Sequence, residues 1–294
     1  MAWRQLIIEA QQADQEALEE ALWQAGACAI SLEDAADQPL LEPAPGELPR
    51  WQQARLIALF TLDDPPEAIL ARLDQALGQQ PLPVYRFEVL ADQDWQRVWL
   101  DSYHPIRFGA RLWVCPSHRQ PPEPDAINVI LDPGLAFGTG THETTALCLR
   151  WLAELPLKGT TVIDYGCGSG ILGIATALLG ASRIYATDID PQALVATLNN
   201  ARRNQVDERL WADFPAVLPP LAADVLIANI LARPLIELAP LFAQNVRPAG
   251  HIALAGLLRM QAAEVTAAYA PWFTLGIHDH QDDWVLLAGV RHAP

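Results

Sequence analysis

Lysine is nearly missing from this chain, because Lys158 is the one lysine among 294 residues and the other basic residues are arginine. Basic residues as a whole are few: 19 of them face 35 acidic residues, which leaves a net charge of −16. Proteins that bind nucleic-acid phosphates depend on basic patches. The composition therefore disfavours a nucleic-acid partner and is better suited to a basic one.

Cysteine is also scarce, and its four positions lie far apart in the sequence. They fit neither a disulfide framework nor the spacing of a zinc site, so reduced thiols are expected. The most apolar stretch, residues 170–181, is much shorter than the roughly 20 residues of a membrane-spanning helix. The N-terminus does not have the basic and apolar segments of a signal peptide. We therefore expect a cytoplasmic protein without membrane attachment.

The length of the chain and its hydrophobic content of 51% indicate two globular domains. In residues 1–90 the strand and helix patterns follow the order βαββαβ, which is typical of a ferredoxin-like α+β sandwich. Strands are expected at 3–9, 27–33, 54–62 and 85–90, and helices at 14–25, capped by Asp14, and from Pro65 to residue 77. This segment has 15 acidic and five basic residues, so it carries most of the excess acid.

The rest of the chain predicts a linker followed by an α/β domain. Residues 91–105 are expected to form a linker helix. Trp95 and Trp99 lie one turn apart on it, and we expect them to pack between the domains rather than to stack on a ligand. From 106 to 294 apolar strands alternate with helices, which is typical of a parallel sheet covered on both faces. The expected elements are strands at 111–115, 128–131, 160–164, 183–187, 209–213, 223–228 and 250–255, a helix at 143–155, and a hairpin of strands 273–278 and 284–289.

The strongest chemical motif is a strand that ends at Asp164 and runs into a glycine-rich turn, residues 166–170. Asp188 ends the next strand, where an acidic side chain can bind the hydroxyls of a ribose. One alternative is a nicotinamide-dependent oxidoreductase, because the pattern that starts at Gly168 matches G-x-G-x-x-G. The Asp164 carboxylate would repel a pyrophosphate but suits an amino group. S-adenosylmethionine, with its ammonium, sulfonium and ribose, is therefore favoured as the ligand.

Two further segments are expected to border the same crevice. Residues 131–145 place three glycines, four threonines and Phe137 before a helix, and this favours a loop that covers the cofactor or contacts the substrate over a plain capped turn. Asn229 ends its strand as the two aspartates end theirs, and open α/β sheets bind ligands at the carboxyl ends of strands. The His-rich segment 278–283 favours a polar hairpin tip, so no metal site is predicted.

These motifs and the chain as a whole resemble the bacterial methyltransferases of large-subunit ribosomal protein eleven. The resemblance rests on the Phe-Gly-Thr-Gly-Thr-His sequence at 137–142, on residues 164–170 and 188–191, and on Asn-Ile-Leu-Ala at 229–232. It implies a Rossmann-like class I methyltransferase domain that binds S-adenosylmethionine and methylates Lys side chains or the N-terminal amine. It also implies that the acidic first domain captures the ribosomal protein. The cofactor-binding residues predicted from the motifs and the resemblance are Phe137, Gly138, Thr139, Thr145, Asp164, Gly166, Gly168, Gly170, Asp188 and Asn229.

The expected chemistry is an attack by a neutral amine on the methyl group. A Lys amine at pH 7 is neutral in about one molecule in 10³, which costs on the order of 4–5 kcal/mol. The Asn229 carbonyl oxygen is the expected acceptor that orients the amine, and His142 and His104 are candidate bases. A base of a nucleic acid is disfavoured as substrate, because residues 230–232 offer no aromatic face for stacking. Asp213 is an open candidate for the adenine contact, and a cofactor-binding scaffold without catalysis is the remaining alternative.

Overall fold

The structure is a computed structural model that describes residues 2–36, 38, 50–78, 82–90, 103–132 and 142–293. Contacts divide the chain into two compact units, Met1–Trp99 and Leu100–Pro294. The predicted linker helix, with Trp95 and Trp99, lies almost entirely outside the described residues, so the domain bounds given above stay a prediction. In the described part of the chain, no helix is both long enough and apolar enough to cross a membrane.

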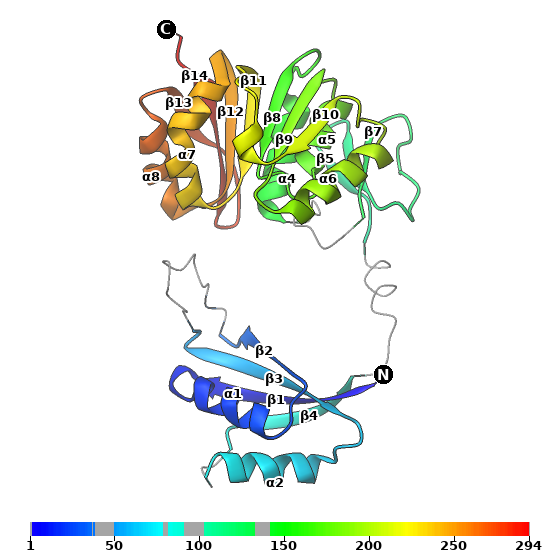
Figure 1. Cartoon of the computed structure of the whole chain (residues 1–294), viewed down its shortest axis with the longest axis vertical. Helices are drawn as coiled ribbons and strands as arrows, with labels where there is room; N and C mark the ends of the chain where they lie inside the picture. Colours follow the sequence, from blue (N-terminus) through cyan, green and yellow to red (C-terminus); the bar gives the residue numbers. More distant parts are fainter. Residues whose placement is uncertain are drawn as a thin grey trace. The chain divides into compact units, whose positions relative to one another are not determined.

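The first unit is a four-stranded antiparallel sheet with two helices (Figure 1). Alternate residues of the central strands, such as Leu6, Leu56 and Phe60, are fully buried against the helices. The sheet order β2-β3-β1-β4 and the element order confirm the ferredoxin-like arrangement. Its elements are β1 (Trp3–Gln11), α1 (Gln15–Gln24), β2 (Ala29–Asp34), β3 (Gln53–Thr61), α2 (Pro66–Ala76) and β4 (Tyr85–Leu90).

The second unit is built on a seven-stranded sheet of order β10-β9-β8-β11-β12-β14-β13. The first five strands of this order are parallel, and β14 pairs antiparallel with both neighbours. The elements of this sheet and its covering layers are α4 (Glu143–Glu154), β8 (Thr161–Tyr165), α5 (Ile171–Leu178), β9 (Arg183–Thr187), α6 (Pro191–Arg203), β10 (Leu210–Asp213), β11 (Ala223–Asn229), α7 (Ala232–Asn245), β12 (Val246–Leu258), α8 (Ala262–Tyr269), β13 (Phe273–Gln281) and β14 (Trp284–Arg291).

Two apolar layers cover the faces of this sheet. Residues of α4, α5 and α6 share one core with Val162 of β8, whereas residues of α7 and α8 share the other core with Ile163, the next residue along the same strand. This alternation is expected of a strand buried on both faces. The chain enters the sheet at β8, moves outward to β10, and then crosses to β11. The reversal places a switch point between β8 and β11, where open α/β sheets bind their ligands.

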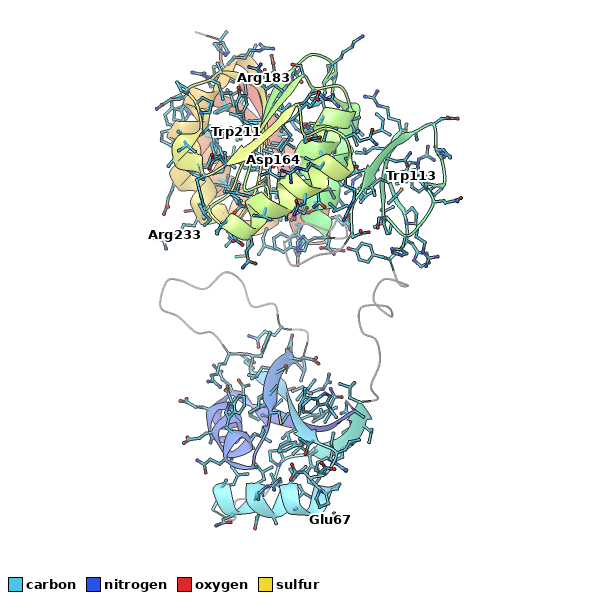
Figure 2. The ribbon with its side chains drawn as sticks, turned by 45° about the vertical axis from the view of Figure 1, so that its right-hand side comes forward. Glu67, Trp113, Asp164, Arg183, Trp211 and Arg233 are labelled. Atoms are coloured by element: carbon cyan, nitrogen blue, oxygen red, sulfur yellow. The ribbon has the colours of Figure 1, made fainter. Side chains whose placement is uncertain are left out.

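A separate three-stranded sheet contains β5 (Ile106–Phe108), β6 (Leu112–Cys115) and β7 (Ile127–Ile130), and Figure 2 shows Trp113 on it. The sequence predicted β6 and β7 but not β5, because three residues are too few to show an alternation. It also did not predict α8, whose alanine-rich sequence has little contrast between its faces. The predicted side-chain cap at Asp14 is wrong, because Asp14 makes no capping bond and ends a short 3₁₀ turn.

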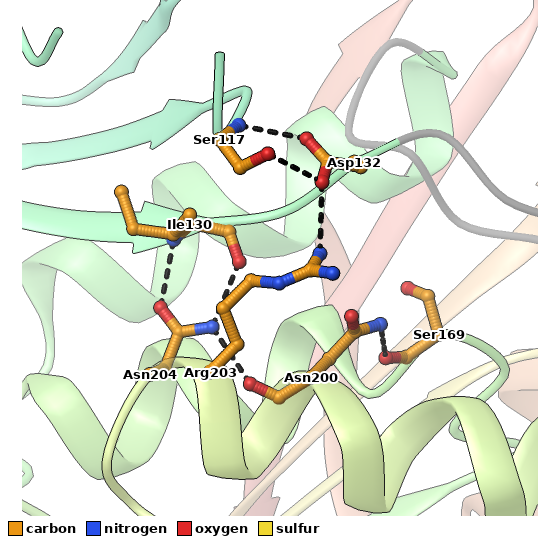
Figure 3. Close-up of polar contacts among 7 residues, drawn as sticks. All are labelled: Ser117, Ile130, Asp132, Ser169, Asn200, Arg203 and Asn204. Atoms are coloured by element: carbon orange, nitrogen blue, oxygen red, sulfur yellow. Dashed lines mark hydrogen bonds and ion pairs between the residues drawn. The ribbon is translucent and has the colours of Figure 1, made fainter. Parts of the chain in front are cut away.

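Polar side chains of α6 and of Asn204, its C-cap residue, tie the glycine-rich turn to the end of β7 (Figure 3). The Asn204 side chain accepts a hydrogen bond from the backbone N–H of Ile130 (2.7 Å) and donates one to its carbonyl oxygen (2.8 Å). One turn earlier, Asn200 Nδ2 donates to the carbonyl oxygen of Ser169 (2.9 Å). The same face of α6 therefore fixes both segments, which are about 40 residues apart in sequence.

Asp132, just after β7, is held in the same network. Its carboxylate accepts hydrogen bonds from the N–H and Oγ of Ser117 (2.7 and 2.6 Å) and pairs with Arg203 at 3.0 Å. Burial raises the pKa of Asp132, but the Ser117 bonds and the Arg203 charge outweigh it, and the pKa lies below its ordinary value. The chain is thus anchored where it enters residues 133–141.

Replacing Asn204 by alanine tests this tie. Asn204→Ala leaves the N–H and carbonyl of Ile130 without their side-chain partner, so we expect the free energy of unfolding to fall by about 1–3 kcal/mol. Asn199→Ala is the matched control, because Asn199 is an exposed residue of α6, the helix that Asn204 ends, and alanine there favours the helix slightly. Chemical denaturation measures both. Equal stabilities of the two variants would contradict the role of Asn204.

Candidate active site

A cavity of about 620 Å³ lies at the switch point, within the usual size range of ligand pockets. Its wall is mostly apolar and is formed by the carboxyl ends of β8, β9 and β11, by α7, and by single residues of α4, β12 and β14. The lining residues are Thr144, Tyr165, Gly166, Gly168, Asp188, Ile189, Pro215, Asn229, Ile230, Leu231, Pro234, Glu237, Leu238, Gly256 and Trp284.

The glycine-rich turn forms the floor of the cavity between β8 and α5. The N–H groups of Gly166 and Cys167 both donate to the carbonyl oxygen of Thr187, which binds the turn to the end of β9. Gly166 has a φ of +77°, and a Cβ atom there would lie 2.3 Å from Cγ2 of Ile230. No residue with a side chain fits at that position. The turn therefore keeps bare backbone next to the space in which a ligand would lie.

Asp188, at the end of β9, presents a fixed carboxylate to the cavity. One oxygen accepts a hydrogen bond from the N–H of Gly168 (2.9 Å), and the other accepts one from the N–H of Asp190 (3.0 Å). An ionised carboxylate has about four acceptor positions, so each oxygen can accept a further hydrogen bond. Two adjacent ribose hydroxyls are suitable donors for such a pair of oxygens.

Asp164, at the end of β8, lies beneath the turn and not on the cavity wall. Its side chain is 1% exposed, and Oδ2 accepts a hydrogen bond from the N–H of Gly173 in the first turn of α5 (2.8 Å). The residue at the N-cap, Gly170, has no side chain to accept that bond. Asp164 therefore caps α5 from below. The sequence predicts a direct cofactor contact for Asp164, whereas the structure shows it as a cap that does not line the cavity.

The burial of Asp164 changes its acidity. Loss of hydration raises its pKa to about 7, the negative charge of Asp188 adds to the rise, and the Gly173 bond opposes it. Among the described residues, Oδ1 has no hydrogen-bond partner. The thiols of Cys148 and Cys167 are also buried, and burial together with the Asp164 charge raises the pKa of each. The thiols therefore stay protonated, and none of these three groups lines the cavity.

Asn229 and Thr145 connect the end of β11 to the start of α4. Asn229 lines the cavity, and its Nδ2 donates to Oγ1 of Thr145 at 3.3 Å. This bond assigns the nitrogen to Thr145 and leaves the carbonyl oxygen as the acceptor of the side chain. Thr145 itself is 1% exposed and does not line the cavity, whereas the preceding Thr144 does. The structure therefore shows Thr145 as the partner of Asn229.

The two candidate bases lie outside the cavity lining. His142 is the N-cap of α4: its Nδ1 accepts from the N–H of Thr144 (3.3 Å) and lies 2.8 Å from Thr144 Oγ1. The ring also packs edge-on against Trp284, with centroids 5.2 Å apart. These bonds give Nδ1 a structural role. His104 is exposed, in the segment before β5. Their role as bases therefore stays a prediction.

The remaining predicted residues have different positions. Gly170, with a φ of +79°, starts α5 and packs against Thr197 without lining the cavity. Phe137, Gly138 and Thr139 lie outside the described residues. Asp213 does not line the cavity, and its carboxylate accepts a hydrogen bond from the N–H of Phe214.

Sequence reasoning did not identify Glu237, Gly256 and Trp284. Residues 230–232 offer no aromatic side chain, but Trp284 supplies an indole ring to the cavity from the last hairpin. The sequence does contain a signal for Trp284. It begins a strand that runs antiparallel to the others, and the start of such a strand lies beside the carboxyl ends of the parallel strands. In the described part of the chain, no three His, Cys, Asp or Glu residues form a group that could hold a metal ion.

Comparison with known proteins identifies the family. The sequence model of the family described as ribosomal protein L11 methyltransferase (PrmA) matches residues 2–292. This chain belongs to that family. Proteins named ribosomal protein L11 methyltransferase from Nitrosococcus oceani and Marinobacter nauticus are 49% and 50% identical to it, over 99% of the chain and 100% and 99% of their own lengths. The crystal structure of a ribosomal protein L11 methylase from Lactobacillus delbrueckii subsp. bulgaricus aligns with a TM-score of 0.60 and 32% identity, covering 65% of this chain and all of that one.

Membership of the L11 methyltransferase family confirms the resemblance drawn from the motifs and argues against the oxidoreductase alternative. Of the predicted site residues, the structure places Gly166, Gly168, Asp188 and Asn229 on one cavity wall. Thr145 lies directly behind that wall, bonded to Asn229. Asp164 lies beneath the turn, and Figure 2 shows it within the large sheet of this unit.

The pKa of Asp164 predicts a pH-dependent stability. Its folded-state pKa of about 7 lies above its ordinary value of 3.8, so the folded state favours the protonated carboxyl group. The stabilisation is complete below 3.8 and is lost progressively as the pH rises to and through 7. Asp164→Asn keeps an acceptor for the Gly173 N–H and cannot ionise. As the pH rises from 5 to 8, wild type should lose stability that the variant keeps. The difference in unfolding free energy, variant minus wild type, should therefore increase by on the order of 1–3 kcal/mol.

Denaturant titrations at several pH values measure this difference. The difference in unfolding free energy should increase with pH up to about 7 and stay constant above it. Curves for the two proteins that remain parallel from pH 5 to 8 would show that Asp164 is already ionised in the folded protein.

Proposed function

We propose that this chain transfers methyl groups from S-adenosylmethionine to amino groups of ribosomal protein L11, on Lys side chains or the N-terminal amine. The observation that carries the proposal is the shared cavity wall, on which the Asp188 carboxylate and the Asn229 carboxamide flank the bare backbone of the glycine turn. The first is suited to the ribose of the cofactor and the second to the amine of the substrate. We also propose that the protein acts in the cytoplasm.

The residues at the turn fit the proposed cofactor. Gly166 and Gly168 present backbone without side chains to the cavity, and each Asp188 oxygen can accept a further hydrogen bond from a hydroxyl group. When bound, the cofactor supplies an activated methyl group on a positively charged sulfur. Asp188 would hold the ribose, and the apolar wall around Ile230 would exclude water from the reacting atoms. Most of the rate enhancement would then come from positioning.

The amine needs an acceptor and a low local polarity. The Asn229 carbonyl oxygen can accept an N–H of the incoming amine and so direct the lone pair toward the methyl group. Thr145 would act as a positioning residue, because it binds the carboxamide nitrogen and keeps the oxygen available. A mostly apolar cavity disfavours the ammonium form and lowers the pKa of the amine. This recovers part of the cost of deprotonation without a general base.

Charge on the first unit supports its role in docking. Residues 1–90 carry a net charge of −10, and ribosomal proteins are generally basic. Complementary charge mainly increases the rate of association. We propose that this acidic surface captures the substrate protein and that nucleic acid is not bound directly, since the same charge repels phosphates.

The activity is tested by cofactor binding and by product mass. S-adenosylhomocysteine at about 100 times its Kd should raise the Tm by about 5 °C or more, and NAD should not. Asn229→Ala should keep this shift but lower kcat for methyl transfer to L11 by about 100-fold, because the amine is no longer oriented. Asn199→Ala, on the exposed face of α6, should behave as wild type. Full activity of Asn229→Ala would refute the proposed role of the carboxamide.

Docking is tested on the full-length protein with labelled L11. The association rate constant should fall by about tenfold between low and physiological ionic strength. Neutralising four exposed acids of the first unit should reduce it further, and neutralising four exposed acids of the second unit should not. The set in the first unit is Glu16, Glu20, Glu67 and Asp74. The set in the second unit is Asp207, Glu208, Glu264 and Asp283, and all eight residues are exposed. Equal effects of the two sets would contradict docking by the first unit.

A further inference from the structure

Trp284 is an aromatic residue of the cavity that the proposed reaction does not yet use. Among the described lining residues, Tyr165 and Trp284 are the aromatic ones. Tyr165 is 9% exposed, and its ring packs against Phe242 with centroids 4.9 Å apart. Trp284 is half-buried, and so it is the aromatic residue with more surface available to a ligand.

The position of Trp284 is fixed by the sheet and by a tight turn. It is the first residue of β14 and pairs with Leu258 of β12 and Gln281 of β13. The turn before it is anchored through the carbonyl oxygen of Asp283, which accepts from the N–H of Arg259 (2.8 Å). The His142 ring supports the indole on one side. A rigid aromatic ring therefore stands at the same cavity as the Asn229 carboxamide.

Successive methyl transfers to one amine change what the cavity must bind. In each transfer the bond from sulfur to methyl carbon breaks, its electron pair stays on sulfur, and a nitrogen–carbon bond forms. The nitrogen becomes positively charged and must release a proton to water before it can attack again. Each added methyl group replaces one N–H that could donate a hydrogen bond to Asn229. A trimethylated nitrogen has no N–H left to donate. A hydrogen-bond acceptor alone therefore binds the more methylated forms progressively less well.

We propose that the indole of Trp284 forms a binding subsite for methylated ammonium groups, and that this subsite lets one amino group receive more than one methyl group. The inference rests on the proposed function. The neutral amine is still the attacking species, and positive charge develops on its nitrogen as the new nitrogen–carbon bond forms. An aromatic face attracts this charge, and the methylated ammonium product, through its ring electrons and needs no N–H. The aliphatic wall formed by Ile230, Leu231 and Leu238 offers contact area but no preference for charge. Glu237 is an exposed residue of α7 that pairs with Arg233 at 3.3 Å, and Asp188 is held by the N–H groups of Gly168 and Asp190. The indole is the aromatic face of the wall that remains for this task.

Intact-mass spectrometry of L11 during turnover tests the subsite. In Trp284→Leu the rates of the second and third transfers, relative to the first, should fall by about fivefold or more, and mono- and dimethylated products should accumulate. Trp284→Phe should fall between this variant and wild type. Trp113→Leu is the matched control, because Trp113 lies on the three-stranded sheet, outside the cavity lining, with Arg107 over its ring.

A binding measurement separates charge from shape. Calorimetry on the full-length enzyme with S-adenosylhomocysteine bound compares a trimethyl-lysine peptide with its neutral isostere, in which carbon replaces the charged nitrogen. Wild type should bind the charged peptide at least about fivefold more tightly, and Trp284→Leu should lose this preference. Equal affinity for the two peptides in wild type, or an equal loss of all three transfer rates in Trp284→Leu, would overturn the proposal. Absence of even the first transfer in wild type would instead refute the proposed function.

Discussion

The close approach of Gly166 to Ile230 is the steric constraint on which the cavity depends. Strands β8 and β11 are neighbours in the sheet, and their parallel register places Ala228 opposite Tyr165. The two chains therefore leave the sheet side by side, and only a residue without a side chain can occupy position 166. Because of this contact, the glycine turn and the Asn229 carboxamide border the same space. A cofactor group and a substrate group can then meet there without any movement of the strands.

The rest of the site follows from how the turn is held. Asp164 supports it from below through α5, Asn200 of α6 binds Ser169 within it, and Thr187 accepts two of its N–H groups. Asp188 is oriented by the same turn, since one of its oxygens accepts from Gly168. The cavity wall is thus rigid where a cofactor would contact it. Rigid placement of acceptors is what an enzyme needs when its reagent is already activated.

Much of this arrangement could be predicted from sequence, because it depends on local pattern. Alternating apolar strands, the glycine turn and the acidic residue at the end of β9 each leave a signal within a few residues. The role of Asp164 could not be predicted in the same way, since its position at a strand end fits both a ligand contact and a cap. His142 was ambiguous for a similar reason. Trp284 was missed because its place in the cavity depends on the order of distant strands and not on its neighbours in sequence.

The position of β14 within the sheet has a consequence for synthesis of the protein. This strand follows β12 and β13 in the sequence, yet it lies between them in the sheet and carries Trp284 to the cavity. Its partners leave the ribosome first and must wait for it before their hydrogen bonds are complete. A nascent or prematurely terminated chain that ends before residue 284 therefore has the glycine turn and Asn229 but an unfinished cavity. Such a chain would therefore lack one side of the site even after its central parallel strands had folded.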